Sequence, residues 1–153
     1  MKKLLFGIFT TLIFIASGLV EANAQTVSGS IGAVKRGGST KGTIVMSVPG
    51  GLHVNSSRPN SQYAIPTVVK VSAVGAKVGA VSYPRGKNRK FGFSEDTINV
   101  YEGNTSFGFN LTVPANFKGN IVKVRAVVRY QACTDEVCYP PKSKEITLTA
   151  KVL

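Results

Sequence analysis

The chain has 153 residues, with 19 lysines and arginines against 7 aspartates and glutamates, two cysteines, one histidine and no tryptophan. This length predicts a single domain, and 43% hydrophobic with 17% charged residues is typical of a folded protein. A closed zinc site takes about four protein ligands and a catalytic one about three, and a Ser-His-Asp hydrolase would have only His53 as its base. The composition therefore argues against metal catalysis, and we expect neither a metal nor another cofactor.

The N-terminus has the three parts of a secretory signal. Two lysines follow Met1, an apolar run covers residues 4–20, and Ala22-Asn23-Ala24 has the A-x-A form of a cleavage site. The alternative is an uncleaved membrane anchor, but threonine, serine and glycine interrupt the run, which is marginal for a span of about 20 residues. We expect residues 1–24 to be a cleaved signal peptide and residues 25–153 to be the exported domain, with no stable membrane insertion after cleavage.

Removal of the signal takes away two lysines and one glutamate, so 17 basic and 6 acidic side chains remain and the net charge is +11. Such a charge favours anionic partners and speeds encounter with them, while export argues against nucleic acid. One dense basic cluster, Arg85, Lys87, Arg89 and Lys90, lies among Gly, Pro and Asn residues. This context predicts a solvated loop that aids solubility or steers the approach of anionic partners.

The exported segment predicts an all-β fold, because turn residues separate short runs of β-branched and aromatic residues. In chain order, strands are expected over residues 28–34, 43–48, 67–73, 98–101, 106–113, 122–131 and 145–152. Phe107 and Phe109 alternate on one of these strands and should be core residues. The last two strands alternate apolar and polar residues, as half-buried antiparallel strands do, and should form a hairpin with an elaborated tip. This spacing favours an immunoglobulin-like β-sandwich, with a small barrel as the alternative.

The two cysteines lie in the expected hairpin tip, in the run Tyr130-Gln131-Ala132-Cys133 followed by four residues and Cys138-Tyr139-Pro140-Pro141. In an exported protein, such a pair predicts a disulfide. A structural staple is one interpretation, but loop entropy gives so short a ring only about 2 kcal/mol, against nearly 5 for a loop of about 100 residues. A redox-active pair is the other interpretation, and the residues by themselves favour neither.

This cysteine run resembles the signature of the N-terminal periplasmic domain of the thiol:disulfide interchange protein DsbD. Further similarities follow in order between Pro49 and Pro141, among them Pro49-Gly50-Gly51-Leu52-His53-Val54-Asn55 and Val81-Ser82-Tyr83-Pro84. The resemblance implies an immunoglobulin-like redox domain in the periplasm. It implies that Cys138 forms mixed disulfides and that Cys133 is its resolving partner.

The resemblance also implies partners. The family's domain accepts electrons from a thioredoxin-like domain and passes them to oxidised periplasmic client proteins. Because the chain ends at Leu153, without the membrane and thioredoxin-like domains of the full-length protein, we expect a thioredoxin-like or membrane electron donor to act in trans.

A cap loop with an aromatic shield over the disulfide is a further implication of the resemblance. Residues 90–96 correspond to this loop, so Phe91 or Phe93 would be the shield. His53, Asn55, Tyr130 and Tyr139 are candidates for lining the site, although a histidine on an alternating strand is more often an ordinary surface or core residue.

A competing hypothesis needs no redox chemistry. The chain would then be a secreted, non-catalytic β-sandwich binding module, in which the Cys133–Cys138 disulfide is structural and the basic surface binds an anionic partner. The two hypotheses differ in whether the cysteine pair cycles between oxidised and reduced forms.

Overall fold

The computed structural model describes residues 25–153, so the predicted signal peptide lies outside the described residues. The described chain is built from strands, and it contains no helix long and apolar enough to cross a membrane. The strands are β1 (Thr26–Ile31), β2 (Ser39–Val48), β3 (His53–Asn55), β4 (Val68–Ala73), β5 (Lys77–Val78), β6 (Lys87–Lys90), β7 (Thr97–Tyr101), β8 (Gly103–Thr112), β9 (Ile121–Tyr130), β10 (Ala132–Cys133) and β11 (Lys142–Lys151).

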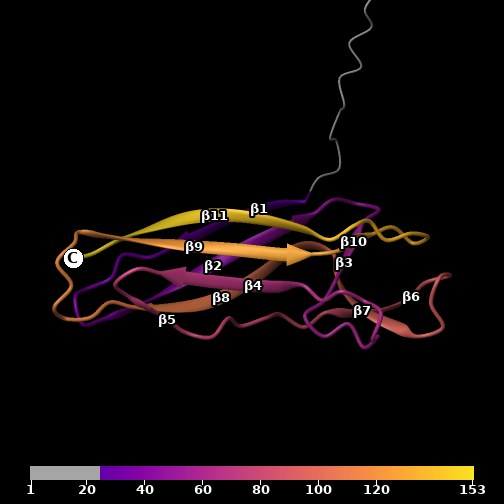
Figure 1. The fold of residues 1–153 in the computed structure, drawn as a ribbon, viewed down its shortest axis with the longest axis horizontal. Helices are drawn as coiled ribbons and strands as arrows, with labels where there is room; N and C mark the ends of the chain where they lie inside the picture. Colours follow the sequence, from indigo (N-terminus) through magenta and orange to yellow (C-terminus); the bar gives the residue numbers. More distant parts are fainter. Residues whose placement is uncertain (1–24) are drawn as a thin grey trace, which may run out of the picture.

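These strands form two facing sheets and a third sheet at one end. One sheet has the order β1-β2-β8-β5, and the other has the order β11-β9-β4. The third sheet, β10-β3-β7-β6, lies at the end opposite the C-terminus (Figure 1). All neighbouring strands within the three sheets are antiparallel. The predicted β-sandwich is confirmed, and the sheets do not join into the alternative small barrel.

Alternating side chains build the main core between the two facing sheets. From β9, the core receives Val122, Val124, Ala126, Val128 and Tyr130, while the residues between them are mostly exposed. Phe107 and Phe109 enter from β8, as predicted. Burial of one face of each strand supplies most of the driving force for this packing.

The last two long strands form the predicted hairpin. β9 and β11 pair antiparallel from Ile121↔Lys151 to Tyr130↔Lys142, so residues 131–141 are the elaborated tip. Part of this tip forms β10, which leaves the β11-β9-β4 sheet and pairs with β3 in the end sheet. The cysteine segment is thereby held between two sheets.

The basic cluster is only partly the loop that its composition suggested: Arg85 is exposed in the loop before β6. Lys87, Arg89 and Lys90 lie in β6, which pairs with β7 at the edge of the end sheet. All four residues of β6 are exposed, so the strand has no apolar alternation by which the sequence could reveal it. The cluster is solvated, as expected, but in an extended and hydrogen-bonded form.

A second, smaller core lies under the end sheet. It consists of Phe91, Ile98 and Val100, with Ala64 packed against it. Phe91 directly follows β6, so this core holds down the connection between β6 and β7. That connection, residues 91–96, makes up the expected cap loop of residues 90–96 except for Lys90, which ends β6, and we call it the cap.

Candidate functional site

The cysteine pair closes a short β-hairpin. Thr134 N–H donates to the Val137 carbonyl at 2.8 Å, and Tyr139 N–H donates to the Ala132 carbonyl at 2.8 Å. Between these two bonds, Cys133 and Cys138 face each other and form a disulfide with an S–S distance of 2.00 Å. Thr134 Oγ1 accepts the backbone amides of Glu136 and Val137, at 3.2 and 3.1 Å, and so shapes the turn. Backbone hydrogen bonds therefore flank the disulfide on both sides.

The two cysteines differ in their access to solvent. Cys133 is 0% exposed and belongs to β10, where its register partner is His53 of β3. Cys138 lies on the outer side of the hairpin and is exposed. An attacking thiolate must approach a disulfide sulfur directly, so access decides which sulfur reacts. Of the two cysteines, Cys138 is the one exposed to solvent, and Cys133 is the buried one.

A buried amide connects the hairpin to the rest of the fold. Asn55 Nδ2 donates to the Ile65 carbonyl at 3.0 Å and to Gln131 Oε1 at 3.2 Å. Gln131 Nε2 in turn donates to the Tyr139 carbonyl at 3.2 Å, next to Cys138. Asn55 is 2% exposed, and hydrogen bonds satisfy a polar group whose burial would otherwise be costly. This chain of hydrogen bonds fixes the position of the exposed cysteine.

Cys138 opens into a cavity of about 440 Å³. Its wall includes Asn55 and Gln131 from the hydrogen-bonded chain, Ile98 from β7, and Phe93 from the cap. The remaining lining residues come from the cap and from the loop after β3: Ser94, Glu95, Asp96, Ser61, Tyr63 and Ala64. The disulfide thus faces a pocket that has an aromatic ring and two carboxylates on its cap side.

The two phenylalanines of the cap have different positions. Phe91 is 4% exposed and belongs to the small core, whereas Phe93 is 42% exposed and lines the cavity with Cys138. Their rings stack with centroids 5.3 Å apart and planes 7° apart. Phe93 therefore lines the cavity of Cys138, and Phe91 is the buried ring on which it stacks.

His53 lies beneath the cap and not in the cavity of Cys138. Its ring stacks on Phe91, with centroids 4.2 Å apart and planes 13° apart. Burial lowers the pKa of His53, while the charges of Asp135 and Glu102 oppose this effect and that of Arg89 adds to it. Burial thus favours the uncharged form of the imidazole.

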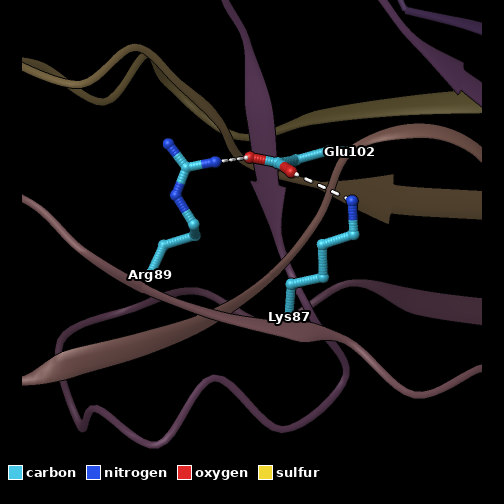
Figure 2. Close-up of polar contacts among 3 residues, drawn as sticks. All are labelled: Lys87, Arg89 and Glu102. Carbon is cyan, nitrogen blue, oxygen red and sulfur yellow. Dashed lines mark hydrogen bonds and ion pairs between the residues drawn. The ribbon is translucent and has the colours of Figure 1, made fainter.

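A charged group flanks His53 at the edge of the end sheet. Glu102, between β7 and β8, binds Arg89 Nη1 at 2.5 Å and Lys87 Nζ at 3.5 Å (Figure 2). His53, Arg89, Glu102 and Asp135 line one cavity of about 310 Å³. This second cavity shares no lining residue with the one at Cys138.

Three comparisons place the chain among known proteins. Residues 24–150 match the family model described as thiol:disulfide interchange protein DsbD, N-terminal. The chain belongs to this family. No curated protein sequence matches the chain.

Two solved structures of periplasmic N-terminal domains have the same fold as this chain. The reduced N-terminal domain of DsbD from Neisseria meningitidis has a TM-score of 0.50 at 19% identity, over 82% of this chain and 85% of that domain. The N-terminal periplasmic domain of ScsB from Proteus mirabilis has a TM-score of 0.56 at 11% identity, over 83% of this chain and 46% of the other. At such identities the likeness shows the fold, which is an immunoglobulin-like β-sandwich.

For this DsbD N-terminal family member, the structure separates the residues that the sequence grouped together. Phe93 and Asn55 share the cavity with Cys138, whereas His53 and Phe91 stack behind it. Tyr130 points into the main core, where burial raises its pKa and its hydroxyl has no hydrogen-bond partner among the described residues. Tyr139 is exposed and contributes its backbone groups to the hairpin.

Sequence reasoning missed several residues of the site. In the sequence Gln131 is simply a member of the cysteine run, yet it links Asn55 to the backbone of Tyr139. Ile98 and Tyr63 lie far from the cysteines in sequence and carry no motif. The one available signal was the polar Asn55 next to an apolar strand residue, because a buried amide demands partners. Its partners could be found only from the folded chain.

Reduction of the disulfide should cost little stability. We expect the reduced protein to have a free energy of unfolding about 2 kcal/mol lower than that of the oxidised protein, because loop entropy is small for so short a ring. The hairpin's backbone hydrogen bonds remain after reduction. Urea denaturation with and without reductant measures this difference, and a Cys133→Ala/Cys138→Ala variant controls for effects of the reductant. A loss above about 4 kcal/mol, or unfolding on reduction, would show a structural staple.

Proposed function

We propose that this chain is a periplasmic thiol–disulfide exchange domain that relays electrons through Cys138 and Cys133. The observation that carries the proposal is the asymmetry of the pair: Cys138 is exposed beside a cavity, and its partner Cys133 is fully buried. A relay needs one sulfur that meets other proteins and one that is protected from them. Membership of the DsbD N-terminal family supports the same chemistry.

Reduction of the domain takes place in two exchange steps. A donor thiolate attacks Cys138 Sγ, the Cys133–Cys138 bond breaks, and Cys133 leaves as a thiolate that takes up a proton. The donor's second thiolate then attacks its own sulfur in the mixed disulfide. This releases Cys138 as a thiol, once it is protonated, and leaves the donor oxidised.

Delivery to a client reverses these roles. The Cys138 thiolate attacks one sulfur of the client disulfide, and the client's other sulfur leaves as a thiolate. The Cys133 thiolate then attacks Cys138 Sγ, which releases the reduced client and restores the Cys133–Cys138 disulfide. Two electrons and two protons pass from donor to client in each cycle.

The exchange requires two kinds of partner. The donor in this proposal is a thioredoxin-like or membrane protein acting in trans, and the clients are oxidised periplasmic proteins. Residues 1–24 act as the signal peptide that exports the domain, and residues 25–153 are the working unit. The cavity beside Cys138 has room for the segment of a partner that carries its reactive cysteine.

The reduction potential of the Cys133–Cys138 pair tests the proposal. We expect a value between about −120 and −270 mV, the range of known exchange proteins. The purified protein is equilibrated with thiol buffers of defined potential, and its free thiols are counted from the mass shift after alkylation. A value below about −300 mV marks a structural disulfide and would overturn the proposal.

A second candidate function has one observation in its favour. The outward face of the β11-β9-β4 sheet carries five basic side chains and one acidic one, Glu145, which is paired with Arg125 at 2.6 Å. The basic side chains are Lys70, Lys123, Arg125, Arg129 and Lys151. This face suits an anionic partner, as a non-catalytic binding module would need. In that case the cysteine pair would stay oxidised in the cell, whereas the cysteine pair of a relay would be found in both the oxidised and the reduced form.

A further inference from the structure

His53 is the only histidine of the chain, and the exchange mechanism does not use it. Its side chain is 2% exposed, and Nε2 has no hydrogen-bond partner among the described residues. A buried ring nitrogen without a partner is unfavourable. A polar group that is kept in such a place calls for an explanation beyond packing.

The position of His53 connects it to the site from two directions. Through its ring it supports Phe91, and Phe91 stacks on Phe93, which lines the cavity of Cys138. Through its backbone it pairs with Cys133 in the β3/β10 ladder. The three rings therefore form a stack that begins at the register partner of Cys133 and ends in the cavity of Cys138.

The charges around His53 come from each element packed against it. Asp135 belongs to the cysteine hairpin, Glu102 follows β7, and Arg89 belongs to β6. Arg89 also lies over the Phe91 ring, with its guanidinium carbon 5.8 Å from the centroid. Glu102 is engaged by Arg89 and Lys87, so the carboxylate of Asp135 is the one near His53 that has no ion pair among the described residues.

We propose that His53 is a positioning residue whose neutral ring holds the cap closed over the disulfide and whose protonation releases it. The inference rests on the exchange function proposed above. An imidazolium needs hydration or an anion, which the Phe91 stack does not offer but the Asp135 carboxylate and open solvent do. Movement of the ring towards either of them withdraws the support of Phe91, and Phe93 then leaves the cavity.

The direction of the pH effect follows from linkage. In the closed cap, burial holds the pKa of His53 below its ordinary value of 6.5, whereas in an open cap the ring is hydrated and titrates ordinarily. Between these two pKa values the open form binds more protons. A fall in pH through this window therefore favours opening, and neutral or alkaline pH keeps the cap closed.

The test compares the wild type with His53→Phe, which retains a stacked ring but cannot ionise. The rate at which excess dithiothreitol reduces the disulfide is measured at pH 7.5 and at pH 5.0. The ratio of the two proteins' rates at each pH cancels the ionisation of the reagent itself. We expect a wild-type to variant ratio near one at pH 7.5 and a several-fold higher ratio at pH 5.0.

A proton NMR titration gives the midpoint independently, because the Hε1 signal of a single histidine needs no assignment. We expect the rate ratio to change at the same pH as this signal. In a Phe93→Ala background, which lacks the shield, the ratio should stay near one at both pH values. If His53→Phe does not fold, His53→Gln replaces it. This variant cannot ionise but also lacks the ring, so only the rise of the wild-type to variant ratio from pH 7.5 to pH 5.0 is compared.

Two results would overturn the inference. A rate ratio that is the same at both pH values would show that His53 only packs. A ratio that falls in acid would show that Asp135 and the imidazolium tighten the cap. Both results are separate from a failure of the exchange function, which would appear as a potential below about −300 mV even if the cap opened in acid.

Discussion

A Cys138→Ser variant is expected to lose exchange activity down to the level of the Cys133→Ala/Cys138→Ala double variant. Cys133→Ala is expected to do something different and to accumulate mixed disulfides with its partners. The physical reason is access: Cys138 is the exposed sulfur, and Cys133 is 0% exposed behind it. Without Cys133, the mixed disulfide at Cys138 has no internal thiolate to resolve it.

The measurement for this pair of variants is trapping in the cell envelope. Each variant is expressed, free thiols are blocked with acid and an alkylating agent, and non-reducing gels are compared with reducing ones. Urea denaturation verifies that both variants are folded. Retained activity in Cys138→Ser, or partner adducts on Cys133 in place of Cys138, would reverse the assigned roles.

Removal of the shield is expected to make the disulfide more reactive. For Phe93→Ala we expect the rate of reduction by dithiothreitol to rise about 2- to 10-fold, because a stacked aromatic pair contributes about 0.5 to 1.5 kcal/mol beyond its buried area. Loss of the Phe91–Phe93 stack makes the open cap correspondingly more populated. To obtain the rate, samples are quenched at set times, their free thiols are alkylated, and the mass shift gives the reduced fraction.

Two further variants separate the roles of the rings near the disulfide. Tyr63 lines the same cavity but is 83% exposed and has no aromatic partner among the described residues, so Tyr63→Ala should leave the rate unchanged. Phe91→Ala removes the same stack and should also raise the rate, but it should in addition lower the free energy of unfolding by about 3 kcal/mol, as truncation of a buried phenylalanine does. Equal rates in Phe93→Ala and wild type would show that the ring does not protect the disulfide.

The long strands could be predicted because their evidence is local. In β9, valines and alanine alternate with lysines and arginines, and a strand with one buried face produces this pattern directly. β6 has no such pattern, since Lys87, Asn88, Arg89 and Lys90 are all exposed. Its pairing with β7 depends on backbone hydrogen bonds, which leave no signature in the side chains.

The residues of the site could also be predicted only in part. The cysteine run and its hairpin context were readable from adjacent residues, and so was the family resemblance. The distinction between Phe91 and Phe93 was not, because both residues are aromatic and belong to the same short segment. It depends on the packing of Phe91 into the core with Ile98 and Val100, which the pairing of β6 with β7 brings together.

The sequence by itself determined an all-β sandwich, a cysteine hairpin between the last two long strands, and the DsbD N-terminal family. This information lies in the alternation of apolar and polar residues along the strands and in one contiguous cysteine motif, and each of these patterns spans only a few residues. Only the tertiary structure decided that Cys133 is buried and Cys138 exposed, that Asn55 holds Gln131, and that His53 supports the cap from behind. These features depend on which strand ends meet when separate sheets pack together, and such contacts arise from the whole chain.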